Sequence, residues 1–455
     1  MDRRRFLRRV GTGLAGGTLL SRPLACVRPP GPATGDRLEW WREARFGMFV
    51  HFGLYSIPGG EWNGEFVGSH EWIRSNAHIP HEEYIPLLAK FDPSGFDADA
   101  WVSLAREAGQ RYLVITTKHH EGFSLFDSAV TDYDVMATPF HKDIMRDIAD
   151  ACRRHDVRIG WYYSIMDWYH PDYLPRRDWE DRDATGADFD RYVTFMKAQL
   201  HELLTHYGDV SILWFDGQWE ATWNHRLGTS LYDYCRSLAP DIIINDRVDA
   251  GTTPEAIATV GRPKVGDFGT PEQEVPATGL PDLDWESCIT MNDNWGWAKD
   301  DHNWKSVDQL VRLLVETASK GGNLLLNVGP MGDGRFPDES IERLRAIGRW
   351  MQRNGDAIYG SSASPFPDAP FRVTTQPDRL NVFVDDWRPG EFVLPGLRTP
   401  PRTARLLADP AAPPIVARLT DSGLALTLPE QRPDGPCPVI TLDFEGPPRV
   451  DGTEA

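Results

Sequence analysis

The chain has 455 residues, which is too many for one small core and indicates two or three domains. Its hydrophobic content of 41% and charged content of 25% are those of an ordinary soluble globular protein. The formal net charge of −19 argues against nucleic acid or an anionic lipid surface as a partner, because both require a basic face.

The first 35 residues have the pattern of an export signal followed by a linker. An arginine-rich segment from Arg3 to Arg8 precedes an uncharged apolar run from Val10 to Leu20, which is too short to span a bilayer. This pattern fits a twin-arginine signal peptide and linker over residues 1–35, so we expect a periplasmic or extracellular protein. A lipid anchor at Cys26 is the less favoured alternative, because a proline stands where lipoprotein signals usually have an aliphatic residue.

Residues 36–360 alternate between apolar runs of strand length and helix-like segments. Eight strands alternating with helices predict an α/β fold, a (β/α)8-like (TIM-type) barrel. The fifth and sixth repeats are weak because no convincing helix lies between residues 247 and 264, so we expect an imperfect barrel, with an open doubly wound sheet as the alternative. The expected strands are 46–52, 112–117, 159–164, 210–215, 242–245, 264–268, 288–291 and 324–328; the expected helices are 98–108, 141–155, 188–206, 227–238, 306–319 and 337–354.

Residues 361–455 have a different hydrophobic pattern from the barrel. Short apolar runs are separated by Pro, Gly and Asp, and helical periodicity stops, which predicts a C-terminal antiparallel β-sandwich. Apart from Cys26, four cysteines are scattered along the whole chain without the paired spacing of a metal site, so we expect buried free thiols: Cys152, Cys235, Cys288 and Cys437.

Polar and aromatic side chains follow six consecutive predicted strands. In a parallel barrel these strand ends meet at one rim, which is where barrel enzymes have their active sites. Helix capping alone would not place histidines, carboxylates and an arginine at one rim. The residues, in strand order, are His51; His119 and His120; Tyr162 and Tyr163; Trp214 and Asp216; Asn245, Asp246 and Arg247; Asp267 and Glu272.

Three chemistries could use such a rim. A metal-dependent, amidohydrolase-like site could draw on the three histidines and Asp216, but that class has a His-x-His pair on its first strand, where this chain has His51-Phe52-Gly53. A Ser or Cys hydrolase would need a nucleophile elbow, which is missing. Glycoside hydrolysis needs two carboxylates among aromatic and hydroxyl-binding groups, and Asp216 with Glu272 meets this need in a chain of 17 Trp.

The sequence resembles glycoside hydrolase family 29, the α-L-fucosidases. The resemblance covers residues 40 to 366 and implies an exo-acting, retaining hydrolase of terminal α-L-fucose on fucosylated oligosaccharides or glycoconjugates. It also implies a barrel with a C-terminal β-sandwich and no metal or other cofactor. The stretches that carry it are Arg45-Phe-Gly-Met-Phe-Val-His51, Thr116-Thr-Lys-His119-His120-Glu-Gly-Phe, Gly160-Trp-Tyr162-Tyr-Ser, Leu213-Trp214-Phe-Asp216-Gly, Asn245-Asp-Arg247 and Asn323-Leu-Leu-Leu-Asn-Val-Gly-Pro.

When the family's residue roles are matched to this sequence position by position, the resemblance implies that Asp216 is the nucleophile. The acid/base varies in position across the family; Glu272 matches best, and Glu274 and Glu286 are the alternatives. A non-catalytic fucose-binding paralogue is the alternative function, but the carboxylate pair is intact. The residues implied to bind fucose are His51, His119, His120, Tyr162, Trp214 and Arg247, with Trp295 packing on the fucose methyl group.

The family also has an early Glu-Trp pair that contacts fucose, and two pairs occur here. Glu71-Trp72 is favoured over Glu61-Trp62, because it stands just before the helix-like segment 79–91 as the family's pair does.

Overall fold

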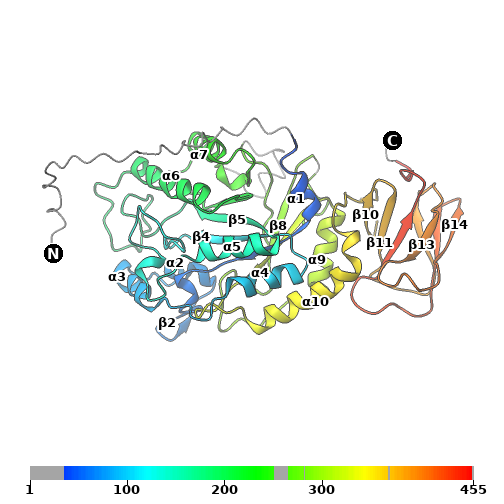
Figure 1. Cartoon of the computed structure of the whole chain (residues 1–455), viewed down its shortest axis with the longest axis horizontal. Helices are drawn as coiled ribbons and strands as arrows, with labels where there is room; N and C mark the ends of the chain where they lie inside the picture. The colour runs from blue at the N-terminus through cyan, green and yellow to red at the C-terminus, as the bar shows by residue number, and fades with distance from the viewer. Residues whose placement is uncertain (1–34, 251–264, 281, 367–368, 453–455) are drawn as a thin grey trace, which may run out of the picture.

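The computed structural model describes residues 35–250, 265–280, 282–366 and 369–452 (Figure 1). Its centre is a parallel sheet of seven strands in the order β7-β6-β5-β4-β1-β9-β8. All residues of these strands except Arg158 are buried, which explains their unbroken apolar runs: both faces of the sheet are covered. The strands are β1 (Phe46–Val50), β4 (Tyr112–Lys118), β5 (Arg158–Ser164), β6 (Ile212–Asp216), β7 (Ile243–Ile244), β8 (Glu286–Thr290) and β9 (Asn323–Val328).

The strand order identifies a barrel rather than an open doubly wound sheet. Each strand pairs with the one that follows it around the sheet, and β1 also pairs with β9, so the first and last strands are neighbours. The two edge strands, β7 and β8, are connected through isolated parallel bridges from Phe268 to Asn245, from Gly269 to Trp285 and from Glu272 to Cys288. The expected (β/α)8-like barrel is therefore confirmed, and it is imperfect at this one place.

The predicted strand at 264–268 is wrong over the residues that the structure describes. Residues 265–267 make no ladder, and Phe268 contributes a single bridge. Gly266 has φ 125°, and a Cβ at this position would lie 2.6 Å from Asp246 Cα, so the chain must turn closely over the end of β7. The backbone N–H of Asp267 donates to the Ile244 carbonyl (2.7 Å), while its carboxylate accepts from the Ile244 amide (2.8 Å), so a side chain takes part in the pairing beside β7.

Helices surround the sheet and begin close to the predicted residues (Figure 1). Asp97, Asp143, Asp188 and Ser306 accept backbone hydrogen bonds as N-caps, so the helices start after these residues. Pro337 occupies the N-cap position of the last helix rather than its first turn. The helices are α1 (Glu39–Ala44), α2 (Ile73–Asn76), α3 (His81–Tyr84), α4 (Ala98–Glu107), α5 (Ile144–His155), α6 (Phe189–Thr205), α7 (His225–Leu238), α9 (Val307–Ser319) and α10 (Asp338–Asn354).

The C-terminal part is the predicted antiparallel β-sandwich, seen at one end of the molecule beyond α9 and α10 (Figure 1). Its two sheets enclose a separate apolar core that includes Leu380, Leu424 and Leu442. Trp350 of α10 donates its indole N–H to the carbonyl of Pro436 (2.8 Å), which attaches the sandwich to the barrel. One sheet has β10 (Arg372–Gln376), β11 (Arg379–Phe383), β16 (Val439–Asp443) and β13 (Thr403–Leu406); the other has β12 (Gly390–Pro395), β15 (Gly423–Leu428) and β14 (Val416–Thr420).

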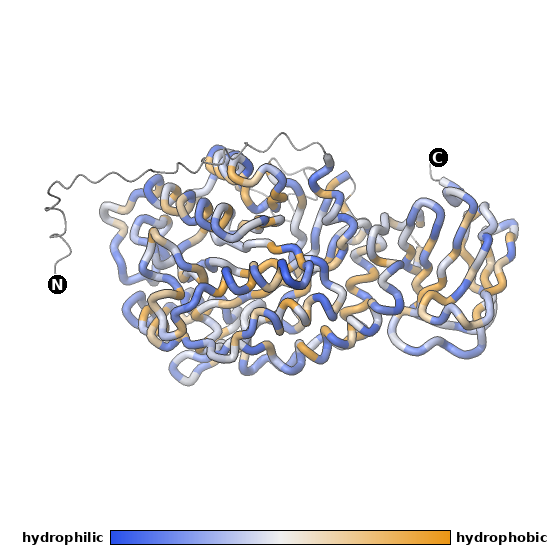
Figure 2. The backbone as a smooth tube through the Cα atoms, viewed as in Figure 1, coloured by the Kyte–Doolittle hydropathy of each residue, from blue (hydrophilic) through white to orange (hydrophobic). Residues whose placement is uncertain are grey.

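Hydrophobic residues follow the strands and the inward faces of the helices, with hydrophilic residues outside (Figure 2). Cys152, Cys235, Cys288 and Cys437 are buried and free, as expected. Within the described ranges, no helix combines the length and the apolar character needed to cross a membrane. The predicted signal segment, residues 1–34, lies outside the described residues.

Candidate active site

A cavity of about 410 Å³ opens at the carboxyl ends of the barrel strands. It lies at the rim predicted from the sequence, and every residue with an expected catalytic or fucose-binding role except His120 contributes to its wall; of the other rim residues, Tyr163, Asn245, Asp246 and Asp267 do not. The lining residues that were predicted are Asp216, Glu272, His51, Glu71, Trp72, His119, Tyr162, Trp214, Arg247 and Trp295.

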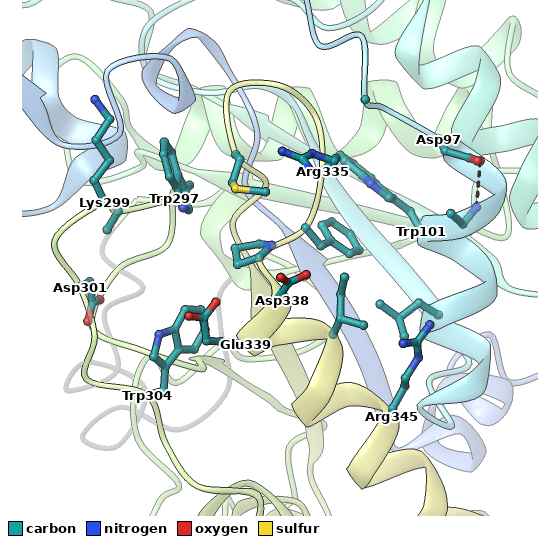
Figure 3. A pocket seen from close by; sticks show the side chains of 18 of the residues that line it. Asp97, Trp101, Trp297, Lys299, Asp301, Trp304, Arg335, Asp338, Glu339 and Arg345 are labelled. Carbon is teal, nitrogen blue, oxygen red and sulfur yellow. Dashed lines mark hydrogen bonds between the residues drawn. The ribbon is translucent and has the colours of Figure 1, made fainter.

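A second and larger pocket, of about 580 Å³, lies between the N-termini of α4 and α10 (Figure 3). It contains none of the predicted site residues, although its wall includes Trp297, which follows Trp295 by two residues in the same loop. Asp338 and Glu339 line it from the first turn of α10, Asp97 from the N-cap of α4 and Asp301 from a loop. The two carboxylates that share one cation, Asp216 and Glu272 on Arg247, lie in the smaller cavity at the strand ends.

Arg247 joins the two candidate catalytic carboxylates. Its Nη1 donates to Asp216 Oδ1 (2.9 Å) and its Nη2 to Glu272 Oε2 (2.8 Å). Thr270 fixes the guanidinium from the other side, accepting from Nε at its hydroxyl (2.9 Å) and from Nη2 at its carbonyl (3.1 Å). The planar fork therefore holds both carboxylates at set positions on one cation.

Asp216 is the last residue of β6 and has a donor on each carboxylate oxygen. Besides Arg247 on Oδ1, the hydroxyl of Tyr162 donates to Oδ2 (2.9 Å). His120 Nε2 lies 3.5 Å from the same Oδ2. Gly217 follows with φ 88°, so the chain turns away immediately and leaves the carboxylate at the end of the strand.

Glu272 lies at the mouth of the cavity, with its side chain 38% exposed. The alternatives are elsewhere: Glu274 is exposed and does not line the cavity. Glu286 begins β8, at the opposite end of the barrel, where it accepts a hydrogen bond from Tyr112 and burial raises its pKa to about 7. Of the three acids considered, only Glu272 therefore shares the cavity with Asp216.

Phe49 is the centre of the aromatic floor of the cavity, and the sequence analysis missed it. Its ring lies 4.4 Å from that of His51, 5.1 Å from that of Trp214 and 5.8 Å from that of Trp295. The available signal was its position two residues before His51 on one strand, which places both side chains on the same face.

Two further predicted residues, His119 and Tyr162, form a parallel pair of rings in the wall. Their centroids are 5.5 Å apart at an interplanar angle of 15°, and burial lowers the pKa of His119 well below its ordinary value. Both line the cavity.

Only one of the two Glu-Trp pairs lies at the cavity. Glu71 and Trp72 both line the cavity, and Glu71 accepts a hydrogen bond from the Gly296 amide (3.2 Å). Burial raises the pKa of Glu71 to about 7. The Glu61-Trp62 pair belongs to a short hairpin, where Glu61 pairs with Lys299 (3.2 Å), and neither residue lines the cavity.

Asn327, near the end of β9, fixes the chemical form of His51. Its amide nitrogen donates to the carbonyl of Trp295 (2.7 Å), so its Oδ1 is the atom that faces His51 Nδ1 at 2.7 Å. An amide oxygen only accepts, so Nδ1 carries the proton and Nε2 is left as an acceptor. Burial lowers the pKa of His51 to about 3, which keeps the ring neutral.

His120 lies behind the cavity wall. Its Nδ1 is 2.6 Å from Ser164 Oγ, and that hydroxyl donates to the carbonyl of Met166 (2.8 Å). Nδ1 is therefore tied to Ser164, and Nε2 on the other side of the ring is directed at Asp216 Oδ2.

An imperfect (β/α)8 barrel with two carboxylates on one guanidinium, in an aromatic cavity at the strand ends, defines a glycoside hydrolase. A family model described as Alpha-L-fucosidase matches residues 34–356. The chain therefore belongs to the α-L-fucosidase family, as the sequence motifs indicated. Within the described residues, no group of three or more His, Cys, Asp or Glu side chains is arranged to hold a metal ion.

Curated relatives and solved structures agree with this assignment. The chain is 30% identical over 439 residues to an α-L-fucosidase of Branchiostoma floridae, covering 90% of this chain and 94% of the relative. It is similar to the structure of α-L-fucosidase isoenzyme 1 from Paenibacillus thiaminolyticus, with 38% identity, a TM-score of 0.80, and coverage of 90% of this chain and 99% of that one. A family-29 α-L-fucosidase from Bacteroides thetaiotaomicron, solved as a trapped covalent intermediate in complex with 2-fluoro-fucosyl fluoride, has 31% identity, a TM-score of 0.79, and coverage of 93% and 99%.

The role of Asn327 can be tested by replacing it with aspartate. Asn327→Asp cannot donate to the Trp295 carbonyl, and its negative charge beside Nδ1 should raise the pKa of His51 from about 3 toward its ordinary value. Nitrogen NMR of labelled histidines, with the His51 signal identified by its loss in His51→Gln, should show a neutral Nδ1–H ring in the wild type. In the variant the ring should become doubly protonated as the pH falls.

Asn323→Asp is the matched control. Asn323 is a buried asparagine on the same strand and also donates to a carbonyl, that of Trp41 (2.7 Å), but it lies at the other end of β9. The Asn323→Asp variant should leave the His51 signal unchanged. A wild-type His51 protonated at Nε2, or the same titration in both variants, would contradict the assignment.

Proposed function

We propose that this chain is an exo-acting, retaining α-L-fucosidase that removes terminal α-L-fucose from fucosylated oligosaccharides or glycoconjugates. The observation that carries the proposal is the single guanidinium of Arg247 bound to both Asp216 and Glu272, inside the aromatic cavity of a chain of this family. The covalent intermediate trapped in the Bacteroides thetaiotaomicron relative supports the retaining mechanism. A non-catalytic fucose-binding protein would have no need of the second carboxylate.

Asp216 is the nucleophile in this proposal. It attacks the anomeric carbon, the bond to the leaving oxygen breaks, and a fucosyl ester forms on the carboxylate. Its charge is stabilised before attack by the Tyr162 hydroxyl and by Arg247, and the buried end of the cavity keeps water away from it.

Glu272 is the acid/base in this proposal. In the first step it gives a proton to the leaving oxygen. In the second step its carboxylate accepts a proton from the attacking water. Its position at the open mouth suits both the departing group and the entering water.

The sugar is bound by neutral acceptors and an aromatic wall. His51 presents an unprotonated Nε2 to a fucose hydroxyl, because Asn327 holds its proton on Nδ1. Trp295 packs on the fucose methyl group, and Trp214, Glu71, Trp72 and His119 complete the wall, while His120 supports Asp216 from behind.

Replacing the nucleophile should remove the covalent step. Asp216→Ala should lower kcat on an aryl α-L-fucoside by several orders of magnitude, because that group contributes many kcal/mol to lowering the barrier. Azide can enter the vacated space and should restore turnover, giving a fucosyl azide of inverted configuration, which product NMR would identify. Restored turnover with a retained product would contradict the role of Asp216.

Replacing the acid/base should have a different signature. Glu272→Ala should still form the intermediate from substrates with good leaving groups, which need little protonation, and azide should give a product of retained configuration. Natural glycans should hardly be cleaved. Glu274→Ala is the control and should behave as the wild type; near wild-type cleavage of glycans by Glu272→Ala would transfer the role to another acid.

We further propose that the protein is exported by the twin-arginine route, with a lipid anchor at Cys26 as the minor alternative. Arg3→Lys with Arg4→Lys should leave active enzyme in the cytoplasm, because the signal requires the arginine pair. Cell fractionation followed by activity measurement would show this, with Arg8→Lys as the control that should still be exported. Unchanged export of the double variant would exclude this route.

A further inference from the structure

The rim of the catalytic cavity has an exposed tryptophan that none of the assigned roles uses. Trp219 is 47% exposed, a large fraction for an indole, and it lines the cavity. The other large hydrophobic side chains exposed in the described ranges do not line this cavity: Phe66, Val130, Val416 and Leu419. An exposed aromatic ring in the wall of a cavity offers apolar surface to a ligand in that cavity.

Trp219 is held in a fixed orientation. It follows Asp216 by three residues, and its ring stacks on that of Trp72 at 6.3 Å with an interplanar angle of 21°. Trp72 in turn contacts the buried ring of Trp168 at 5.1 Å, and the edge of Trp219 meets His120 at 6.0 Å. These rings run from the buried Trp168 to the half-exposed Trp219, so the indole of Trp219 is supported from below and still has exposed surface.

The position of these rings relative to the carboxylates suits a leaving group. Asp216, Tyr162 and Trp214 make up the buried end of the cavity, whereas Glu272, which protonates the leaving oxygen, is at the mouth. In an exo-acting enzyme the rest of the substrate must therefore extend outward past the mouth. There Trp219 is accompanied by polar lining residues that can bind hydroxyl groups: Ser69, Asn76, Gln273 and Asp293.

We propose that Trp219 is the stacking platform of a leaving-group subsite, and that this subsite binds a pyranose through its apolar C–H face. An indole face with polar side chains around it matches the amphipathic surface of a sugar ring. The inference rests on the proposed function and narrows it: the preferred substrates are those in which fucose is joined to another sugar. Binding energy from that sugar then contributes to the first chemical step.

The test compares two substrates that share fucose and differ in the leaving group. α-L-Fucosyl fluoride has a single-atom leaving group, whereas the second substrate is whichever α1,2-, α1,3-, α1,4- or α1,6-fucosylated oligosaccharide the wild type cleaves fastest. Trp219→Ala should shift the ratio of the two kcat/KM values about tenfold toward the fluoride, equal to about 1.4 kcal/mol. Trp219→Phe, which keeps an aromatic face, should restore most of the ratio.

Phe66→Ala is the matched control, because Phe66 is an exposed aromatic residue in the hairpin strand β3 (Glu65–Phe66), outside the cavity. It should leave both kcat/KM values unchanged. The inference is overturned if the ratio stays constant in both Trp219 variants, whether the two rates fall together or neither falls. Failure of the wild type to hydrolyse either substrate would instead overturn the proposed function, so the two failures are distinguishable.

Discussion

The active site depends on one buried cation between two carboxylates. Arg247 is almost fully buried, and a charge in that position requires partners of opposite sign and complete hydrogen bonding. Although burial lowers the pKa of Arg247, the charges of Glu272 and Asp216 outweigh that effect and hold the pKa above its ordinary value. Thr270 completes the arrangement, since its hydroxyl accepts from Arg247 and donates to Asp246 (2.7 Å). Without the cation, two carboxylates would repel each other in a site of low dielectric, so the guanidinium makes the pair compatible with a folded cavity.

The irregular closure of the barrel is what brings these groups together. Arg247 belongs to a single 3-10 turn directly after β7, and Glu272 belongs to the segment that replaces a regular strand between β7 and β8. A regular strand there would alternate its side chains between the core and the helices, as β6 does up to Asp216. The isolated bridge from Glu272 to Cys288 instead leaves the carboxylate at the mouth, within reach of the same guanidinium as Asp216. The weak sequence pattern of the sixth repeat and the position of Glu272 therefore have the same physical origin.

Most of the barrel and most of the cavity wall could be predicted from the sequence, because burial on both faces leaves unbroken apolar runs and parallel strands end at one rim. The exceptions have definite reasons. The segment 265–268 is apolar enough for a strand, but it turns at Gly266 and pairs with β7 partly through the side chain of Asp267, which no hydrophobic pattern reveals. Sequence position favoured Glu71-Trp72 over Glu61-Trp62, but only the folded chain shows that Glu71 and Trp72 line the cavity and that Glu71 contacts Gly296. Asn327 could be quoted as part of a motif, but its function depends on which amide atom faces His51, and that depends on the Trp295 carbonyl.

The two ends of the cavity differ in burial and in hydrogen bonding. Under the proposed function this difference predicts strict selection of the sugar and tolerance of the group attached to it. At the buried end the polar groups are held in fixed positions: Asn327 sets the proton on His51, and Tyr162 and Arg247 donate to both oxygens of Asp216. A sugar with a hydroxyl missing or misplaced would leave buried groups unpaired, which is costly in a site of low dielectric. At the open end Trp219 offers a flat apolar face with water on one side. Stacking on such a face depends on area rather than on directed hydrogen bonds, so different pyranoses can use it with similar free energies.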